Sequence, residues 1–216
     1  MNGFFPLILS SPSGGGKTTI AKALLRRRND MGYSVSCTTR PARAGEKEGQ
    51  DYFFVTQSAF EDARARGEFA ESAEVHGNLY GTLRREVDRV LASGRHVVMD
   101  IDVQGTRQFV KAYPESVLVF LIPPDAEILL TRLRGRGTES AESMSRRIKS
   151  AVEELKAVDL YGYLVVNEDL DEAVRDVSAI VDGEAKRLSR LDEARARIGA
   201  MVTDLESELE KMTRRV

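Results

Sequence analysis

A glycine-rich loop between an apolar run and an amphipathic stretch is the feature that most restricts how this chain can fold. The apolar run, residues 4–9, predicts a buried strand, and the stretch after the loop predicts a helix. The loop nearly fits the phosphate-loop pattern GxxxxGK[ST], with the sequence Ser11-Pro12-Ser13-Gly14-Gly15-Gly16-Lys17-Thr18-Thr19. Glycines let backbone N–H groups approach phosphates closely, and the start of the following helix adds positive potential. The strand–loop–helix order therefore favours a site for nucleotide phosphates over a turn that binds nothing.

Two side chains of the loop carry the chemistry that such a site needs. Lys17 supplies a compact positive charge for the β and γ phosphates, and the Thr18 hydroxyl can ligate Mg²⁺. Ser11 departs from the pattern, because it stands where the first glycine belongs. A serine would cost about 1 kcal/mol or more if that position needed a positive φ. We expect an ordinary backbone conformation at Ser11 and hence an intact loop.

Further apolar runs alternate with amphipathic stretches along the chain. Residues 97–99, 117–122 and 164–166 are short apolar runs typical of buried parallel strands. Between them apolar residues recur with helical spacing, and we expect these stripes to pack against the sheet. One such stripe consists of Met144, Ile148, Val152 and Leu155. The alternation predicts an α/β fold with a mostly parallel sheet flanked by helices.

The alternation is interrupted between residues 34 and 82, where Gly, Thr and aromatic residues accumulate. We expect an inserted lobe there, with a strand near residues 52–55 and a short helix near residues 58–66. The predicted organisation is one domain over residues 1–187 and a helical extension over residues 188–216. Within the domain we expect a core (1–33 and 83–187), the lobe (34–82) and a lid (about 134–147).

The extension repeats apolar residues with the spacing of a coiled coil. Its seam, which only Arg195 interrupts with a polar residue, consists of Leu188, Leu191, Ile198, Val202, Leu205, Leu209, Met212 and Val216. Either the helix pairs with another helix, which would make the chain a homo-oligomer, or it packs on the body of its own chain. A free helix of this kind is only marginally stable in water.

Composition excludes several classes of function. The 216 residues contain 32 Lys and Arg against 34 Asp and Glu, so neither a non-specific nucleic-acid coat nor a polybasic membrane patch is supported. The single cysteine, Cys37, cannot form an intrachain disulfide, which suits a reducing compartment. The longest apolar run, residues 117–122, is far shorter than the ~20 residues of a membrane helix. We expect a cytoplasmic protein that binds neither nucleic acid nor membrane.

Two arginines in a loop rich in Pro and Gly suggest a second anion site. Arg40 and Arg43 lie three residues apart, and two guanidinium groups suit one phosphate dianion. Downstream follow the segments Gly49-Gln50-Asp51-Tyr52-Phe53-Phe54-Val55, Gly67-Glu68-Phe69-Ala70-Glu71, Glu74-Val75-His76-Gly77-Asn78-Leu79-Tyr80-Gly81-Thr82 and Met99-Asp100-Ile101-Asp102-Val103-Gln104-Gly105.

With these motifs in this order, the sequence resembles guanylate kinases from about Phe4 to Ala185. The resemblance implies an α/β core with a GMP-binding lobe and a mobile lid. It implies transfer of the γ-phosphoryl group of ATP to GMP, and to dGMP, in purine nucleotide metabolism, with Mg²⁺. Two positions depart from the family, since Ser72 follows Glu71 where many members have Trp, and Leu79 stands where a second Tyr is common.

The resemblance also implies a role for individual residues. Those that contact the guanine base would be Ser36, Glu71, Thr82 and Asp102. Those that hold the GMP phosphate would be Arg40, Arg43, Tyr52 and Tyr80. ATP would contact the loop from Ser11 to Thr19 and, near its adenine, Asn167, although a helix-cap or turn role for Asn167 is nearly as good. The residues acting on the transferred phosphoryl group would be Lys17, Arg132, Arg136 and Arg147. Mg²⁺ would be held by Thr18 and Asp100.

The chemistry of guanine supports Glu71 as the principal base reader. Guanine presents its N1–H and its exocyclic amine as adjacent donors, and a carboxylate offers two acceptors. Adenine has a bare N1 acceptor at that place, which a carboxylate would repel. Two other classes of function remain open: a scaffold module that resembles the enzyme without catalysis, and a kinase for another nucleotide.

Overall fold

The computed structural model describes residues 3–75, 77–134, 141–187, 190 and 192–213. Its central element is a five-stranded sheet in the order β2-β7-β1-β8-β9, in which every neighbouring pair is parallel. The strands are β1 (Pro6–Ser10), β2 (Met31–Tyr33), β7 (His96–Asp100), β8 (Val117–Ile122) and β9 (Tyr163–Val166). The predicted mostly parallel α/β fold is confirmed, and the strand expected at residues 4–9 begins two residues later.

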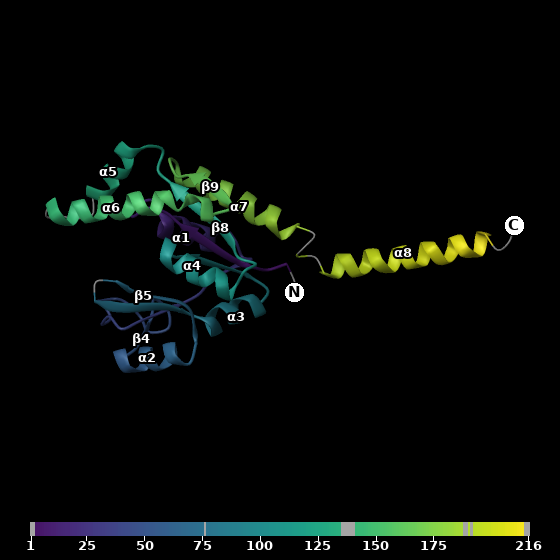
Figure 1. Cartoon of the computed structure of the whole chain (residues 1–216), viewed down its shortest axis with the longest axis horizontal. Helices are drawn as coiled ribbons and strands as arrows, with labels where there is room; N and C mark the ends of the chain where they lie inside the picture. The colour runs from purple at the N-terminus through teal and green to yellow at the C-terminus, as the bar shows by residue number, and fades with distance from the viewer. Residues whose placement is uncertain (1–2, 76, 135–140, 188–189, 191, 214–216) are drawn as a thin grey trace.

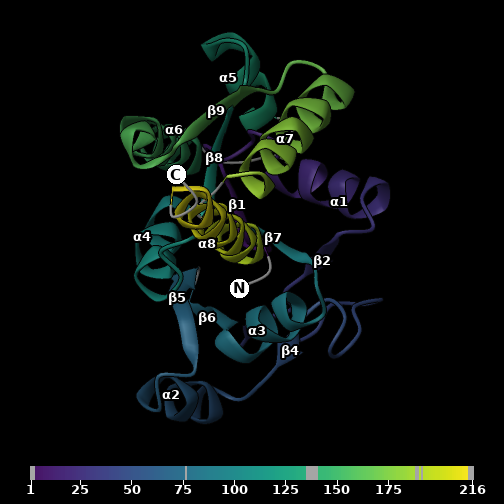
Figure 2. The same cartoon turned by 90° about the vertical axis from the view of Figure 1, so that its right-hand side faces the viewer.

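Helices cover both faces of this sheet because alternate residues of the strands point to opposite sides. Leu7 and Leu9 of β1 pack with α1 (Lys17–Arg27) and α7 (Leu170–Ala185). Ile8, between them, packs on the other face with α3 (Arg84–Ala92) and α4 (Val103–Ala112). Figure 2 shows α1 and α7 on one side of the sheet and α4 on the other.

Aspartates fix the starts of three helices. The carboxylate of Asp102 accepts the N–H of Gly105 at 2.7 Å at the start of α4, and that of Asp169 accepts the N–H of Glu172 at 2.9 Å at the start of α7. Asp125 accepts the N–H of Ile128 at 2.8 Å at the start of α5 (Ala126–Arg134). Such caps satisfy N–H groups that have no partner within the helix. They therefore fix where the loops end at the edge of the sheet that carries the site.

A second, smaller sheet forms within residues 36–83. It contains β3 (Ser36–Thr38), β4 (Phe53–Phe54), β5 (Phe69–Val75) and β6 (Asn78–Leu83), in the order β4-β3-β6-β5, and is covered by α2 (Gln57–Ala65). Its own core includes the rings of Phe60 and Phe69, stacked 4.3 Å apart, together with Cys37. This core is separate from the core of the parallel sheet. The second sheet is therefore a unit of its own, and its side chains can face those of the parallel sheet.

One helical stripe was predicted wrongly. Ile148, Val152 and Leu155 of α6 (Ala141–Lys156) do not pack against the sheet and are exposed. The buried contact of α6 is instead made by Ala151, which packs with Leu129 and Leu133 of α5. The helix therefore lies against α5, where Met144 of the predicted stripe also packs, whereas the other three residues of the stripe are exposed. A short 3₁₀ turn, η1 (Val158–Leu160), joins α6 to β9.

The C-terminal helix α8 (Asp192–Thr213) runs away from the body of the molecule (Figure 1). Four of its apolar side chains, Ile198, Met201, Val202 and Leu205, are 53, 56, 47 and 64% exposed. Of the predicted seam, Leu188, Leu191 and Val216 lie outside the described residues. No helix among the residues that the structure describes is both long and apolar enough to span a membrane.

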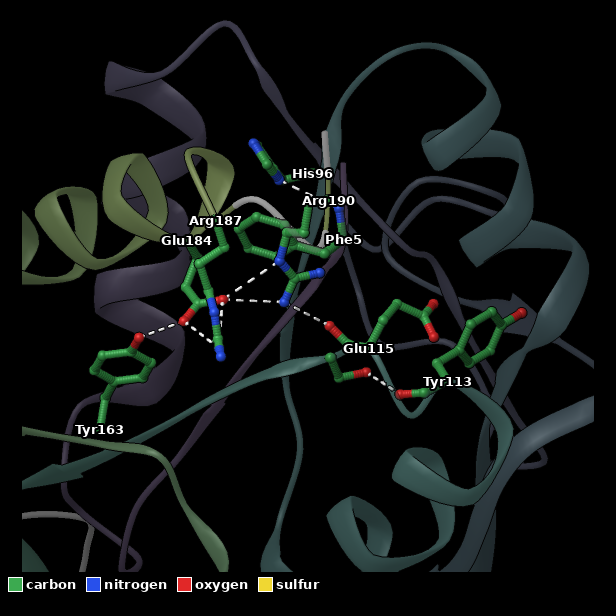
Figure 3. A network of polar contacts seen from close by, with 9 residues as sticks. Phe5, His96, Tyr113, Glu115, Tyr163, Glu184, Arg187 and Arg190 are labelled. Atoms are coloured by element: carbon green, nitrogen blue, oxygen red, sulfur yellow. Dashed lines mark hydrogen bonds and ion pairs between the residues drawn. The ribbon is translucent and has the colours of Figure 1, made fainter. Parts of the chain in front are cut away.

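A buried carboxylate ties the chain to the core just before α8 (Figure 3). Glu184 accepts hydrogen bonds from Tyr163, from Arg187 at 3.0 Å and from Arg190 at 3.1 Å. Burial alone would raise the pKa of Glu184, but these hydrogen bonds together lower it, so the group stays ionised. Arg190 also donates to the Glu115 carbonyl at 2.9 Å and lies 4.4 Å above the ring of Phe5. The chain is thus anchored to the core at residue 190.

Candidate active site

The glycine-rich loop connects β1 to α1, as predicted. Gly14 and Gly16 have φ values of +88° and +96°, a region that other residues rarely adopt. A Cβ on Gly16 would also lie 2.2 Å from the side-chain nitrogen of Asn167. Lys17, at the start of α1, donates to the carbonyl of Ser11 at 2.9 Å. The loop thus brings an ammonium group and a helix N-terminus together, which favours an anion.

Ser11 fits inside the loop by using space that a side chain at position 15 would need. It is buried, and its hydroxyl donates to the carbonyl of Pro12 at 2.8 Å. A Cβ placed on Gly15 would lie only 2.5 Å from the Cβ of Ser11. The serine at position 11 therefore requires a glycine at position 15.

Asn167 and Arg132 pack against the same loop. Asn167 donates from its side chain to the carbonyl of Gly15 at 2.8 Å, and its own carbonyl accepts a hydrogen bond from Arg132 at 3.0 Å. A hollow of 470 Å³ opens here, lined by Gly14, Gly16, Thr19, Arg132, Asn167, Glu168 and Leu170. Arg147 of α6 donates to the carbonyl of Leu133 at 2.8 Å, and the predicted Arg136 lies outside the described residues.

The two predicted metal ligands are in contact. Thr18 donates from its hydroxyl to the carboxylate of Asp100, at the end of β7, at 2.5 Å. Among the described residues no group of three or more His, Cys, Asp or Glu could hold a metal ion. Mg²⁺ does not require such a group, because it commonly takes one or two protein oxygens together with phosphate oxygens and water. A hydroxyl beside a carboxylate fits that preference.

A cavity of 540 Å³ lies between the two sheets and reaches the loop. Its walls bring together most of the predicted GMP contacts and both predicted metal ligands, namely Ser36, Tyr52, Glu71, Tyr80, Thr82, Asp102, Thr18 and Asp100. Arg40 is not part of the wall, but its guanidinium lies 5.4 Å from the ring of Tyr52. Arg43 is exposed. The cavity therefore joins the two regions that the sequence predicted separately.

Glu71 of β5 places a carboxylate in the wall of this cavity. It accepts a hydrogen bond from the hydroxyl of Thr82 on the neighbouring strand β6 at 2.6 Å. Burial is the main cause that raises the pKa of Glu71, and the negative charge of Asp102 acts in the same direction. A Cβ on Gly105 would lie 3.1 Å from the second carboxylate oxygen of Glu71, so the glycine leaves room for this carboxylate at the start of α4. The site therefore presents a carboxyl group whose charged form would gain stability from a ligand with hydrogen-bond donors.

The structure adds two acidic residues that the sequence did not single out. Glu46 pairs with Arg40 through two hydrogen bonds of 2.9 Å and accepts the backbone N–H of Arg43 at 2.7 Å. The Arg40 guanidinium lowers the pKa of Glu46. The sequence feature that could have indicated Glu46 is its position three residues after Arg43, close enough for the two residues to make contact within one loop. Glu154 of α6 accepts the N–H of Ser13 at 3.1 Å across 141 residues, and no local pattern predicts such a contact.

A parallel sheet with a phosphate loop after its central strand defines the class of α/β proteins that bind nucleotides through that loop. Comparisons with known proteins define the family. A family model for guanylate kinases matches residues 4–184. The chain is 44% identical to the guanylate kinase of Nitrosomonas europaea over 183 residues, 85% of this chain and 91% of that protein. It is also 44% identical to the guanylate kinase of Thermotoga maritima, over 85% of this chain and 88% of that protein.

A solved structure agrees with these sequence relatives. The crystal structure of guanylate kinase from Anaplasma phagocytophilum superposes with a TM-score of 0.70 at 35% sequence identity, over 88% of this chain and 90% of that one. The chain therefore belongs to the guanylate kinase family, whose members are nucleoside monophosphate kinases. The matched residues end before α8.

The crowding between Ser11 and Gly15 leads to a prediction about the loop. Gly15→Ala should lower the free energy of unfolding by about 1–3 kcal/mol, because the added methyl group overlaps the Ser11 side chain. Adding Ser11→Gly should recover at least half of that loss. Urea unfolding of the two single variants and the double variant measures this coupling. Gly162→Ala, where a Cβ meets nothing within 4 Å, is the matched control. Equal losses in the single and double variants would contradict the account.

Proposed function

We propose that the chain transfers the γ-phosphoryl group of ATP to GMP and releases ADP and GDP. The observation that carries this proposal is the single cavity whose wall contains both the Glu71–Thr82 pair and the Thr18–Asp100 pair beside the phosphate loop. Such a cavity suits two nucleotides that meet with their phosphates together. Membership of the guanylate kinase family supports the same reaction.

Guanine would be recognised by Glu71, with Ser36, Thr82 and Asp102 around the base. Guanine N1–H and the exocyclic amine would donate to the carboxylate of Glu71 and so stabilise its charged form, which burial disfavours. Thr82 already donates to one oxygen of that carboxylate and so fixes its orientation. A site built on such hydrogen bonds can reject a base that lacks them by about 10⁴-fold.

The GMP phosphate would be held by Arg40, Arg43, Tyr52 and Tyr80. Glu46 would keep the guanidinium of Arg40 in place, since it binds both of its terminal nitrogens. The rings of Tyr52 and Tyr80 lie 6.0 Å apart beside this arginine. An arginine fixed in this way loses little side-chain freedom when a phosphate binds.

The loop from Ser11 to Thr19 would hold the ATP phosphates through backbone N–H groups and Lys17. Arg132, Arg147 and, outside the described residues, Arg136 would stabilise the negative charge on the transferred group. The accepting oxygen of GMP is already anionic, so the reaction needs no general base. Asn167 donates to the carbonyl of Gly15 and lines the hollow of 470 Å³, which supports a role in positioning the loop beside the place where adenine would bind.

Thr18 and Asp100 would hold Mg²⁺. The ion would supply positive charge to the β and γ phosphates of ATP during transfer. We further propose that residues 34–82 form the GMP-binding lobe and residues 134–147 the lid over the core. Because its single cysteine suits a reducing compartment, we propose that the protein acts in the cytoplasm.

A coupled assay of ADP release with GMP, AMP, CMP and UMP tests the proposed reaction. We expect turnover with GMP at a kcat/KM at least about 100-fold above that with the other nucleotides. Arg40→Met should lower kcat/KM for GMP by about 100-fold or more with little change in ATP affinity. Arg64→Met, on the exposed face of α2, is the control. Equal turnover with AMP would contradict guanine selectivity, and turnover with none would favour a scaffold module.

We also propose that α8 pairs with α8 of a second copy of the chain. The exposed side chains of Ile198, Val202 and Leu205 follow the seam that the sequence predicts, and together they support a helical partner. A second copy supplies an identical seam. Arg195 on this seam favours a two-stranded coiled coil, in which its charge can still reach water.

The mass of the protein in solution tests this pairing. Light scattering after size-exclusion chromatography should give twice the chain mass of 24.0 kDa for the wild type. Leu205→Lys should give the mass of one chain, because it replaces an apolar contact of the seam with a second positive charge besides Arg195. Ala200→Lys, on the opposite face of α8, should leave the dimer intact. A wild type with the mass of one chain at all concentrations would refute the pairing.

A further inference from the structure

The phosphate loop already holds an anion, and that anion comes from the chain itself. The carboxylate of Glu154, half-buried on α6, accepts the backbone N–H of Ser13 at 3.1 Å. The positive charge of Lys17 lowers its pKa, and the negative charge of Asp102 raises it. A loop that presents N–H groups and a lysine to phosphates therefore presents one of those N–H groups to an internal carboxylate.

The cost of holding this carboxylate is visible in its environment. Burial raises the pKa of Glu154, and the hydrogen bond from Ser13 and the charge of Lys17 only partly oppose that effect. The carboxylate is thus less well stabilised than a solvated glutamate. A triphosphate would compete for the same positive potential with several negative charges against one.

The contact between Glu154 and Ser13 joins the whole of helix α6 to the phosphate loop. The helix is buried against α5 at Ala151, whereas Ile148, Val152 and Leu155 are exposed. Glu154 is a polar group of this helix that reaches the loop. Arg147, which we place at the ATP phosphates, lies two turns earlier on the same helix.

We propose that Glu154 is an internal competitor for the phosphate loop: it occupies the loop when no nucleotide is bound, and a triphosphate displaces it. The proposal rests on the proposed function, because it assumes that the loop binds ATP. Loading of ATP then releases α6 from the loop at Glu154, and the helix becomes free to bring Arg147 to the phosphates. Binding is weaker than the loop alone would allow, since two anions must exchange.

Removal of the charge tests the proposal, because it predicts a gain in affinity. Glu154→Gln keeps the size of the side chain and an oxygen that can accept the Ser13 N–H. We expect it to bind inorganic pyrophosphate and a non-hydrolysable ATP analogue about fivefold more tightly than the wild type, in titration calorimetry with magnesium. Glu154→Ala should also bind more tightly, and thermal unfolding shows that each variant is folded.

Glu153→Gln is the matched control. Glu153 is adjacent on the same helix, but its side chain is 72% exposed and pairs with Lys156 on the surface. Its affinity for both ligands should stay within about twofold of the wild type. Unchanged or weaker binding by both Glu154 variants would overturn the proposal and leave the kinase function standing. If the wild type and every variant bound neither ligand, the nucleotide site itself would fail, and the proposal with it.

Discussion

The partly buried carboxyl group of Glu71 is the group around which the site is arranged. Charge is costly to bury unless hydrogen bonds compensate it, and in this structure Thr82 supplies one such bond. Gly105 leaves room for the carboxylate, and Asp102 adds a second negative charge nearby. The wall of the cavity therefore favours a flat ligand that brings donors, and guanine has two of them side by side.

Positive groups are gathered where the phosphates of two nucleotides would meet. Lys17 begins α1, directly after the phosphate loop of the parallel sheet, whereas Arg40 lies in the loop that follows β3 of the second sheet and is held by Glu46. Both cations already have a hydrogen-bond acceptor within the chain: Lys17 donates to the carbonyl of Ser11, and Arg40 donates to the carboxylate of Glu46. Glu46 stays beside its arginine and orients it, while Glu154 competes with the ligand for the loop. Acidic residues of the chain thus have two different roles in one site, since one orients a cation and the other competes with the ligand.

The sequence predicted those parts of the molecule that local patterns determine. The loop after β1 and the strands β7, β8 and β9 follow from residue order alone, but β9 is not the buried strand that its apolar run predicted, because Leu164 and Val166 are 54 and 45% exposed. The exposed stripe of α6 was predicted wrongly, because helical spacing indicates an apolar face but not the element that covers it. Ala151, a smaller residue on a neighbouring face, makes the buried contact instead.

Contacts between distant parts of the chain were beyond the reach of such patterns. Glu154 meets Ser13 only because α6 folds back over the loop, and no spacing rule joins residues 141 apart. Glu46 is only six residues from its partner Arg40. The sequence still did not predict this pair, because an acidic residue in a basic loop can equally face solvent or contact another residue. Family resemblance suggested which residues surround the nucleotides, and the structure adds which charges hold those residues in place.

Titration of the wild type with GMP and with IMP tests the central claim, which is that Glu71 reads both donors of guanine. IMP keeps the N1–H but lacks the exocyclic amine, so one acceptor of the buried carboxylate would stay without a partner. The account predicts that GMP binds at least about tenfold more tightly than IMP, and that Glu71→Gln abolishes the difference. Equal affinities of the wild type for GMP and IMP would contradict it.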